Sequence, residues 1–267
     1  MRFGLGKSTA ILFAALAGLG ACATGGMQAT TPTAPLPWTA AIGRLDNEKD
    51  AFSCTATLVA PDTIVTAAHC LFLRGREIDA GNLAFTPFAG GGQRLKPSQG
   101  VQILALGGQV DGDKPSSGET QADWGLVRIS PAISPWIKPL GIANFGADEI
   151  AGKLAAGAAL SNAGYGVYGI MNGKRLHQHD GCGLVRDALP NEELGANVIV
   201  VDCPVIKGDS GGPIMLTEKD GTRRLVGVIS GYLRSKDGAV EVSFGASATN
   251  FAAKLSMIDA AVPAAQP

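Results

Sequence analysis

The chain has 267 residues, of which 37 are glycine and only 6% are aromatic. Its formal charge at pH 7 is -1, which leaves no electrostatic argument for a nucleic-acid partner. The glycine-rich composition and the short apolar runs favour an all-β fold, and the length fits one or two domains.

Residues 1–22 have the proportions of an export signal. Arg2 and Lys7 give a positive start, and the apolar run over residues 10–19 is shorter than a membrane-spanning helix needs. The run ends in Leu19-Gly20-Ala21-Cys22, which resembles a bacterial lipobox, a motif whose cysteine is lipidated. Cleavage after Ala21-Cys22-Ala23 by an ordinary signal peptidase is the alternative, since it also fits the small-x-small rule.

Both interpretations export the chain from a bacterial cytoplasm. Lipidation of Cys22 would attach it to a membrane of the cell envelope, whereas ordinary cleavage would leave it periplasmic or secreted. We favour lipidation, because the fifth cysteine otherwise has no role. Residues 23–40 are then a proline-rich linker, kept extended by Pro32, Pro35 and Pro37.

Four cysteines remain for pairing in an exported chain. They are Cys54, Cys70, Cys182 and Cys203, and four cysteines allow three connectivities.

The folded body is predicted to begin near residue 41, with strands over residues 41–45 and 52–59. Residues 63–70 then run from a strand into a turn of small residues that carries His69. A lone histidine is usually structural, but Cys70 follows it directly and Cys54 lies one hairpin upstream. A bridge between these cysteines would fix the direction of the imidazole, which makes His69 a candidate general base.

Asp123 is the candidate partner of this histidine. It ends a polar loop and immediately precedes an apolar strand, so that its carboxylate could accept the second ring N–H of His69. Asp111 and Asp113 are rivals, but only Asp123 adjoins a strand.

The second half of the chain is also predicted to be strands, over residues 158–166, 184–186, 196–201 and 225–231, after a proline-rich crossover at 131–139. His177, His179 and Asp180 lie in a polar segment, and their spacing could bind a metal. No other ligands support such a site, so we expect a solvated loop there and neither metal nor cofactor.

The stretch from Lys207 to Ile214 places Ser210 among three glycines. Glycine permits a turn that aims the N–H groups of Gly208 and Ser210 at one point, which is an oxyanion hole. Ser210 would stand beside it as the nucleophile.

The segments Thr66-Ala67-Ala68-His69-Cys70 and Gly208-Asp209-Ser210-Gly211-Gly212-Pro213 resemble the histidine and serine motifs of chymotrypsin-fold, trypsin-like serine peptidases. The resemblance implies a peptidase domain over residues 41–262, built as two six-stranded antiparallel barrels at about 41–130 and 140–247. A C-terminal helix at about 248–260 follows them. It also implies hydrolysis of polypeptides by Ser210, His69 and Asp123 through an acyl-enzyme.

The cysteine positions fit this resemblance. A cysteine about sixteen residues before the one that follows the histidine is typical of the family, which favours a Cys54–Cys70 bridge. Cys203 lies seven residues before Ser210, whereas trypsin and its close relatives have a cysteine nearer to the serine. This spacing is more similar to the bacterial branch that includes glutamyl endopeptidases, and it favours a Cys182–Cys203 bridge.

The resemblance also bears on the residue that the enzyme would prefer before the scissile bond. Ser230 matches the pocket serine of the family, with Gly231 and Tyr232 beside it, and Pro204 stands where trypsin-type enzymes hold an aspartate. Ile229 stands where glutamate-specific relatives often hold a histidine. We therefore expect a small or apolar residue before the scissile bond.

Two other functions fit parts of the sequence. Residues 208–212 also satisfy the G-x-S-x-G motif of α/β hydrolases, but that fold needs a histidine after the serine, and none follows Ser210. The other alternative is a non-catalytic peptide- or protein-binding member of the same fold, although inactive relatives usually lack one of the three catalytic residues.

Activation leaves two options. In the trypsin group a newly cut N-terminal amine pairs with the acid before the serine, which is Asp209 here. An acylated Cys22 cannot supply that amine, and residues 23–42 contain no basic cut site. Either a second cut occurs near residues 39–42, or Asp209 has another partner.

Overall fold

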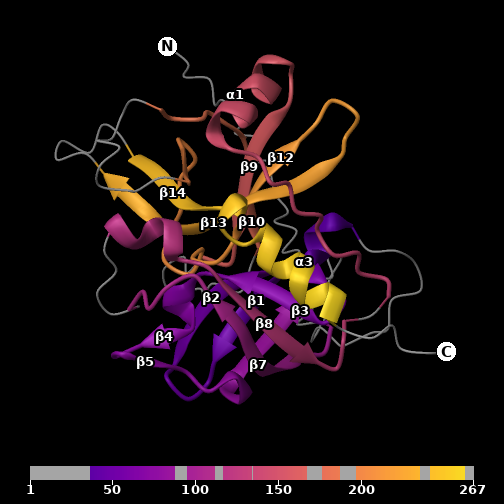
Figure 1. Ribbon diagram of the computed structural model, residues 1–267, viewed down its shortest axis with the longest axis vertical. Coiled ribbons are helices and arrows are strands. Elements are labelled where there is room, and N and C mark those ends of the chain that lie inside the picture. Colours follow the sequence, from indigo (N-terminus) through magenta and orange to yellow (C-terminus); the bar gives the residue numbers. More distant parts are fainter. Residues whose placement is uncertain are drawn as a thin grey trace, which may run out of the picture.

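The computed structural model describes residues 37–87, 95–111, 117–133, 135–166, 176–186, 197–234 and 241–261. The predicted signal segment, Cys22 and most of the predicted linker lie outside these ranges. Within them the chain is mostly antiparallel strands in two sheets, and the predicted all-β fold is confirmed (Figure 1).

The N-terminal sheet is a closed six-stranded barrel. Its strands, in spatial order, are β1 (Ile42–Asn47), β2 (Phe52–Ala60), β3 (Thr63–Thr66), β8 (Gly125–Ser130), β7 (Ser98–Leu106) and β6 (Leu83–Pro87). The barrel closes because β1 pairs with both β2 and β6. β3 is buried at all four positions, as its β-branched residues favour.

The second sheet also has six strands. Their order is β10 (His177–Cys182), β9 (Ala159–Gly164), β12 (Pro213–Thr217), β13 (Arg223–Arg234), β14 (Glu241–Ser247) and β11 (Val198–Val201). The two edges approach each other just beyond β10, where Leu184 bridges to Val201 and the N–H of Val185 donates to the carbonyl of Val200 at 2.9 Å. The sheet therefore curls back towards its own first strand.

β10 corrects one prediction. Residues 177–180 were expected to form a solvated loop, but they pair with β9 from His177↔Gly164 to Asp180↔Ser161. The polar sequence gives no alternation of apolar residues, so the strand is specified by pairing with its neighbour and not by its own pattern.

The buried apolar residues form two clusters, of which the larger fills the barrel and extends to Met215 and Val228 of the second sheet. The barrel core includes Ile42, Leu58, Phe85 and Leu126, and the second core includes Leu160, Ile199, Ile214 and Val226. Ala248, Phe251 and Leu255 belong to the barrel core although they follow the last strand.

Short elements connect and cover the sheets. They are the hairpin strands β4 (Phe72–Leu73) and β5 (Arg76–Glu77), the 3-10 turns η1 (Trp38–Ala41), η2 (Ala68–Cys70), η3 (Ala80–Asn82), η4 (Ser117–Ala122) and η5 (Ala248–Asn250), and the helices α1 (Ala147–Ala155) and α3 (Ala252–Ala261). The predicted C-terminal helix is thus present as η5 and α3, with α3 lying along the barrel (Figure 1). Helix α1 was not predicted. Among the described residues, no helix is both long and apolar enough to cross a membrane.

Candidate active site

The pairing of β3 with β8 brings His69 and Asp123 together. Thr66 pairs with Gly125, so the turn η2 that follows β3 lies beside the residues that precede β8. The ring Nδ1 of His69 is 2.8 Å from Oδ2 of Asp123, and the backbone N–H of His69 donates to Oδ1 at 2.9 Å. Asp123 is only 2% exposed, and it fixes both the backbone and the ring of the histidine.

This contact decides the protonation behaviour of the imidazole. Burial by itself lowers the pKa of His69, but the charge of Asp123 and its hydrogen bond outweigh that effect, so the pKa lies above its ordinary value of 6.5. With Nδ1 held by the carboxylate, Nε2 is the ring nitrogen that remains for another partner.

The rival carboxylates lie elsewhere. Asp111 accepts hydrogen bonds from the backbone N–H groups of Arg74 and Gly75, at 3.1 and 2.9 Å, in the β4–β5 hairpin. Asp113 falls outside the described residues.

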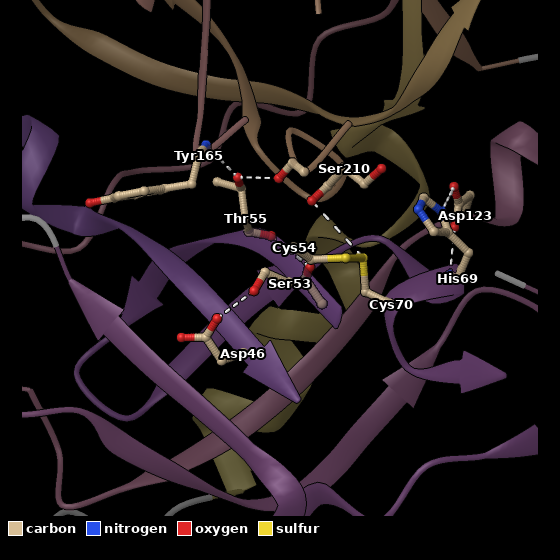
Figure 2. Close-up of a disulfide and its surroundings, with 11 residues drawn as sticks. Asp46, Ser53, Cys54, Thr55, His69, Cys70, Asp123, Tyr165 and Ser210 are labelled. Atoms are coloured by element: carbon tan, nitrogen blue, oxygen red, sulfur yellow. Dashed lines mark hydrogen bonds and ion pairs between the residues drawn. A yellow bond between two sulfur atoms is a disulfide. The ribbon is translucent and has the colours of Figure 1, made fainter. Parts of the chain in front are cut away.

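Ser210 lies next to the histidine turn. Sγ of Cys70 is 4.0 Å from the carbonyl oxygen of Ser210, and in Figure 2 the ring of His69 lies between Ser210 and Asp123. The side chain of Asp123 thus occupies the opposite side of the ring from Ser210 in this view.

The serine turn has the backbone form that its glycines allow. Gly208 and Gly211 have φ values of 103° and 83°, which L-residues rarely adopt. The N–H of Asp209 donates to the carbonyl of Ile206, and that of Gly212 donates to the carbonyl of Asp209. No acceptor among the described residues takes the N–H of Gly208 or Ser210, so these two donors remain for a ligand.

Thr55 of β2 attaches this turn to the barrel. Its N–H donates to the carbonyl of Ser210 and its hydroxyl to the carbonyl of Gly208, both at 2.8 Å. The hydroxyl also accepts from the N–H of Tyr165, and the hydroxyl of Thr66 donates to the carbonyl of Thr55 (Figure 2). Sequence reasoning missed Thr55, because a threonine in a buried strand carries no signal beyond its β propensity.

Both expected disulfides are present. Cys54 is bonded to Cys70, and Cys182 to Cys203. Cys54, His69 and Cys70 offer atoms of metal-ligand type within 4.8 Å of one another, but the two sulfurs are bonded to each other. This group therefore lacks the thiolates that a metal would need.

The expected pocket residues lie on two segments beside the turn. The N–H of Gly211 donates to the carbonyl of Ile229 in β13, so Ser230, Gly231 and Tyr232 follow directly after the point where the strand meets the turn. Pro204 lies between β11 and the turn, and its carbonyl accepts a hydrogen bond from the side chain of Asn162.

His177 is a further residue that the structure places in contact with the turn. Its Nε2 is 3.0 Å from Oδ2 of Asp209, which is 1% exposed. From the sequence, His177 is a candidate only as a metal ligand. Asp209 is the residue that could have indicated this contact, since a buried carboxylate requires a cationic or hydrogen-bonding partner.

Two comparisons with known proteins relate this chain to serine proteases. The family described as trypsin matches residues 24–255. The fold resembles the crystal structure of a thermostable serine protease, AL20, from an extremophilic microorganism, with a TM-score of 0.59 and 20% identity over 84% of this chain and 99% of that one. No curated protein matches the chain. The chymotrypsin-like architecture expected from the motifs is confirmed by this structural likeness.

Proposed function

The chain belongs to the trypsin family of serine proteases, and from that premise we propose that it is an endopeptidase whose catalytic triad is Ser210, His69 and Asp123. Its substrates are polypeptides, as the family implies. The observation that carries the proposal is the double contact of Asp123 with the ring and the backbone of His69, beside the turn that holds Ser210.

The proposed reaction uses these groups in turn. Oγ of Ser210 attacks the peptide carbonyl carbon while Nε2 of His69 takes the hydroxyl proton. The carbonyl electron pair moves to oxygen, where the N–H groups of Gly208 and Ser210 stabilise the negative charge. The C–N bond then breaks, and His69 gives its proton to the leaving amine. Water repeats the sequence on the acyl-serine, which releases the carboxylic acid and restores Ser210.

Asp123 supports each proton transfer without itself taking the proton. Its carboxylate holds Nδ1–H of His69, which selects the tautomer with a free Nε2. The same negative charge stabilises the imidazolium that forms in the transition state, in agreement with the raised pKa of His69.

The test is to purify the chain without residues 1–22, beside its Ser210→Ala variant, and to measure casein cleavage and labelling by a fluorophosphonate. Cleavage and labelling in the first protein, with neither in the second, are expected. A correctly processed chain that folds but gives neither signal would refute the proposal and favour the binding-protein alternative.

For specificity, we propose that a small or apolar residue precedes the scissile bond. The support is that Pro204 supplies no charge, and Ile229 no histidine, at the two positions where relatives recognise charged residues. The spacing of Cys203 from Ser210, with its bridge to Cys182, supports similarity to the bacterial branch that includes glutamyl endopeptidases. A peptide-library profile dominated by Arg, Lys or Glu would contradict the preference for small or apolar residues.

For localisation, we propose export and lipidation at Cys22. The support is the Leu19-Gly20-Ala21-Cys22 motif after an apolar run. Mass spectrometry of the membrane fraction should find an acylated N-terminal cysteine, which a Cys22→Ser variant would lack. An unmodified N-terminus at Thr24 in the soluble fraction would instead show ordinary cleavage.

A further inference from the structure

The turn that carries Ser210 is held from its inner side by a buried carboxylate. Oδ2 of Asp209 accepts hydrogen bonds from the backbone N–H of Ile206 at 2.7 Å and from Nε2 of His177 at 3.0 Å. Asp209 is 1% exposed, and the side chain of His177 is 17% exposed. A carboxylate at this depth is costly unless it is paired, so the orientation of Asp209 depends on these donors.

The surrounding backbone is shaped for this contact. His177 pairs with Gly164 across the β9–β10 ladder, and a Cβ at Gly164 would collide with the carboxylate of Asp209. A Cβ at Gly166 would lie 2.9 Å from Cε1 of His177 and would collide with Ile206. The two glycines that flank Tyr165 therefore make the space in which the acid and the imidazole meet.

The N-terminal stretch offers no competing partner among the described residues. Residues Trp38–Ala41 form the turn η1, in which the N–H of Ala40 donates to the carbonyl of Pro37 at 2.8 Å, and the chain continues directly into β1. Ala40 and Ala41 are buried as part of the barrel core. A cut near residues 39–42 would therefore disrupt packed structure, whereas Oδ2 of Asp209 already has His177 of β10 as a partner; Oδ1 of Asp209 is buried without a hydrogen-bond partner among the described residues.

We propose that His177 is a positioning residue for catalysis. Through Asp209 it holds the turn that carries Ser210, and it thereby takes the place of the newly cut N-terminal amine that pairs with this acid in the trypsin group. This role rests on the proposed peptidase function. His177 contacts Asp209 and not the nucleophile, so its effect reaches the reaction through the backbone of residues 208–210. An enzyme built in this way is competent as soon as it has folded, without a processing cut near residues 39–42.

The first arm of the test varies the donor. His177→Gln keeps a side-chain N–H, and His177→Leu removes it. His179→Leu is the control two residues along the same strand: its ring packs edge-on against that of His177, but no hydrogen bond joins its side chain to Asp209 among the described residues. For His177→Leu we expect kcat and the rate of fluorophosphonate labelling to fall about a hundredfold, with KM within about threefold, because an oxyanion donor acts in the transition state. His177→Gln should recover most of this loss, and His179→Leu should resemble the wild type.

The second arm varies the N-terminus of the wild-type chain. A site-specific cleavage sequence is inserted ahead of Thr39 in the full chain, and kcat is measured before and after the cut. We expect no increase on cutting. This arm decides the question by itself if His177→Leu does not fold, since activity that appears only after the cut would overturn the role of His177.

The outcomes separate the two proposals. A wild-type chain as inert as Ser210→Ala, in the cut and uncut forms alike, overturns the proposed function and with it this inference. An active wild type with an equally active, folded His177→Leu variant overturns only the positioning role. A loss of kcat that His177→Gln does not recover would also overturn it, because the donor would then not be the cause.

Discussion

The hydroxyl of Thr55 donates to the carbonyl of Gly208 at 2.8 Å, and the two residues are 153 positions apart in the sequence. Thr55 belongs to a barrel strand, and Gly208 belongs to the turn that carries Ser210. The bond fixes the direction of the peptide that joins Gly208 to Asp209, and therefore the direction in which the neighbouring N–H groups point.

We predict that Thr55→Val removes this hydrogen bond while it preserves the packing of β2. Valine keeps the shape but leaves the carbonyl of Gly208 and the N–H of Tyr165 without their partner, which should cost about 1–3 kcal/mol of unfolding free energy. A misplaced turn should also lower kcat/KM by about ten- to a hundredfold. Chemical denaturation and steady-state kinetics measure both.

Thr57→Val is the matched control for that experiment. Thr57 is equally buried in the same strand, but its hydroxyl has no hydrogen-bond partner among the described residues. Its replacement should be neutral or slightly stabilising and should leave kcat/KM unchanged. Equal losses in the two variants would show that the Thr55 hydroxyl does not position the turn.

Gly211→Ala should be far more damaging than Gly221→Ala. Both glycines have nearly the same φ, 83° and 82°, so the backbone strain of about 1 kcal/mol is common to the two variants. A Cβ at Gly211 would also collide with the carbonyl of Thr55 and the hydroxyl of Thr66, whereas nothing lies within 4 Å of one at Gly221. The extra cost should be about 1–3 kcal/mol, read from denaturation midpoints. A similar stability of the two variants would contradict this packing.

The acid limb of the pH–rate profile should have its midpoint above 6.5, because His69 must be neutral to accept a proton and its pKa is raised. Stability should change in the opposite direction. A raised folded pKa gives stability that is fully present below the unfolded value near 6.5 and is lost as pH rises through the folded value.

Asp123→Asn removes the charge that raises the pKa of His69. The midpoint should therefore move to lower pH, the decline in stability across this window should disappear, and kcat should fall about 10⁴-fold. Kinetics and denaturation across pH 5–9 test the three effects together. A midpoint that does not move would assign the acid limb to another group.

The two disulfides should differ in their effect on catalysis but not on stability. They close loops with sequence separations of 16 and 21, so removing either pair by alanine substitution should cost about 3 kcal/mol. Only the Cys54–Cys70 bridge adjoins His69, so only its loss should lower kcat/KM at a temperature where the variants stay folded. Activity assays beside thermal melts distinguish the two. Equal kinetic losses would mean that the first bridge does not position the histidine turn.

Local sequence patterns were sufficient for the parts of the site that lie at strand ends. His69 and Asp123 follow and precede apolar strands, and the glycines around Ser210 mark a tight turn, so residue types and neighbours were informative. The resemblance to the family favoured the two disulfides that are present, since the four cysteines by themselves allow three connectivities.

The residues that support the site could not be found in this way. His177 lies in a strand with no apolar alternation, and its partner Asp209 is 32 positions away. Thr55 acts through hydrogen bonds to a segment in the other sheet. The first contact depends on how the serine turn packs against β10 within the second sheet, and the second on how the two sheets meet. Residue periodicity and propensity encode neither of these tertiary properties.

The order in which the strands pair affects a chain that is still being synthesised. β11, which precedes Ser210, pairs in its ladder with β14, the last strand, and the turn itself bonds to β13. A chain synthesised only through Ser210 contains this proposed nucleophile but lacks the strands that shape its turn. Contacts of such long range also form late in folding. On the proposed function, we therefore expect a nascent or truncated chain to be unable to cut its neighbours, because the serine turn takes its shape only in the complete fold.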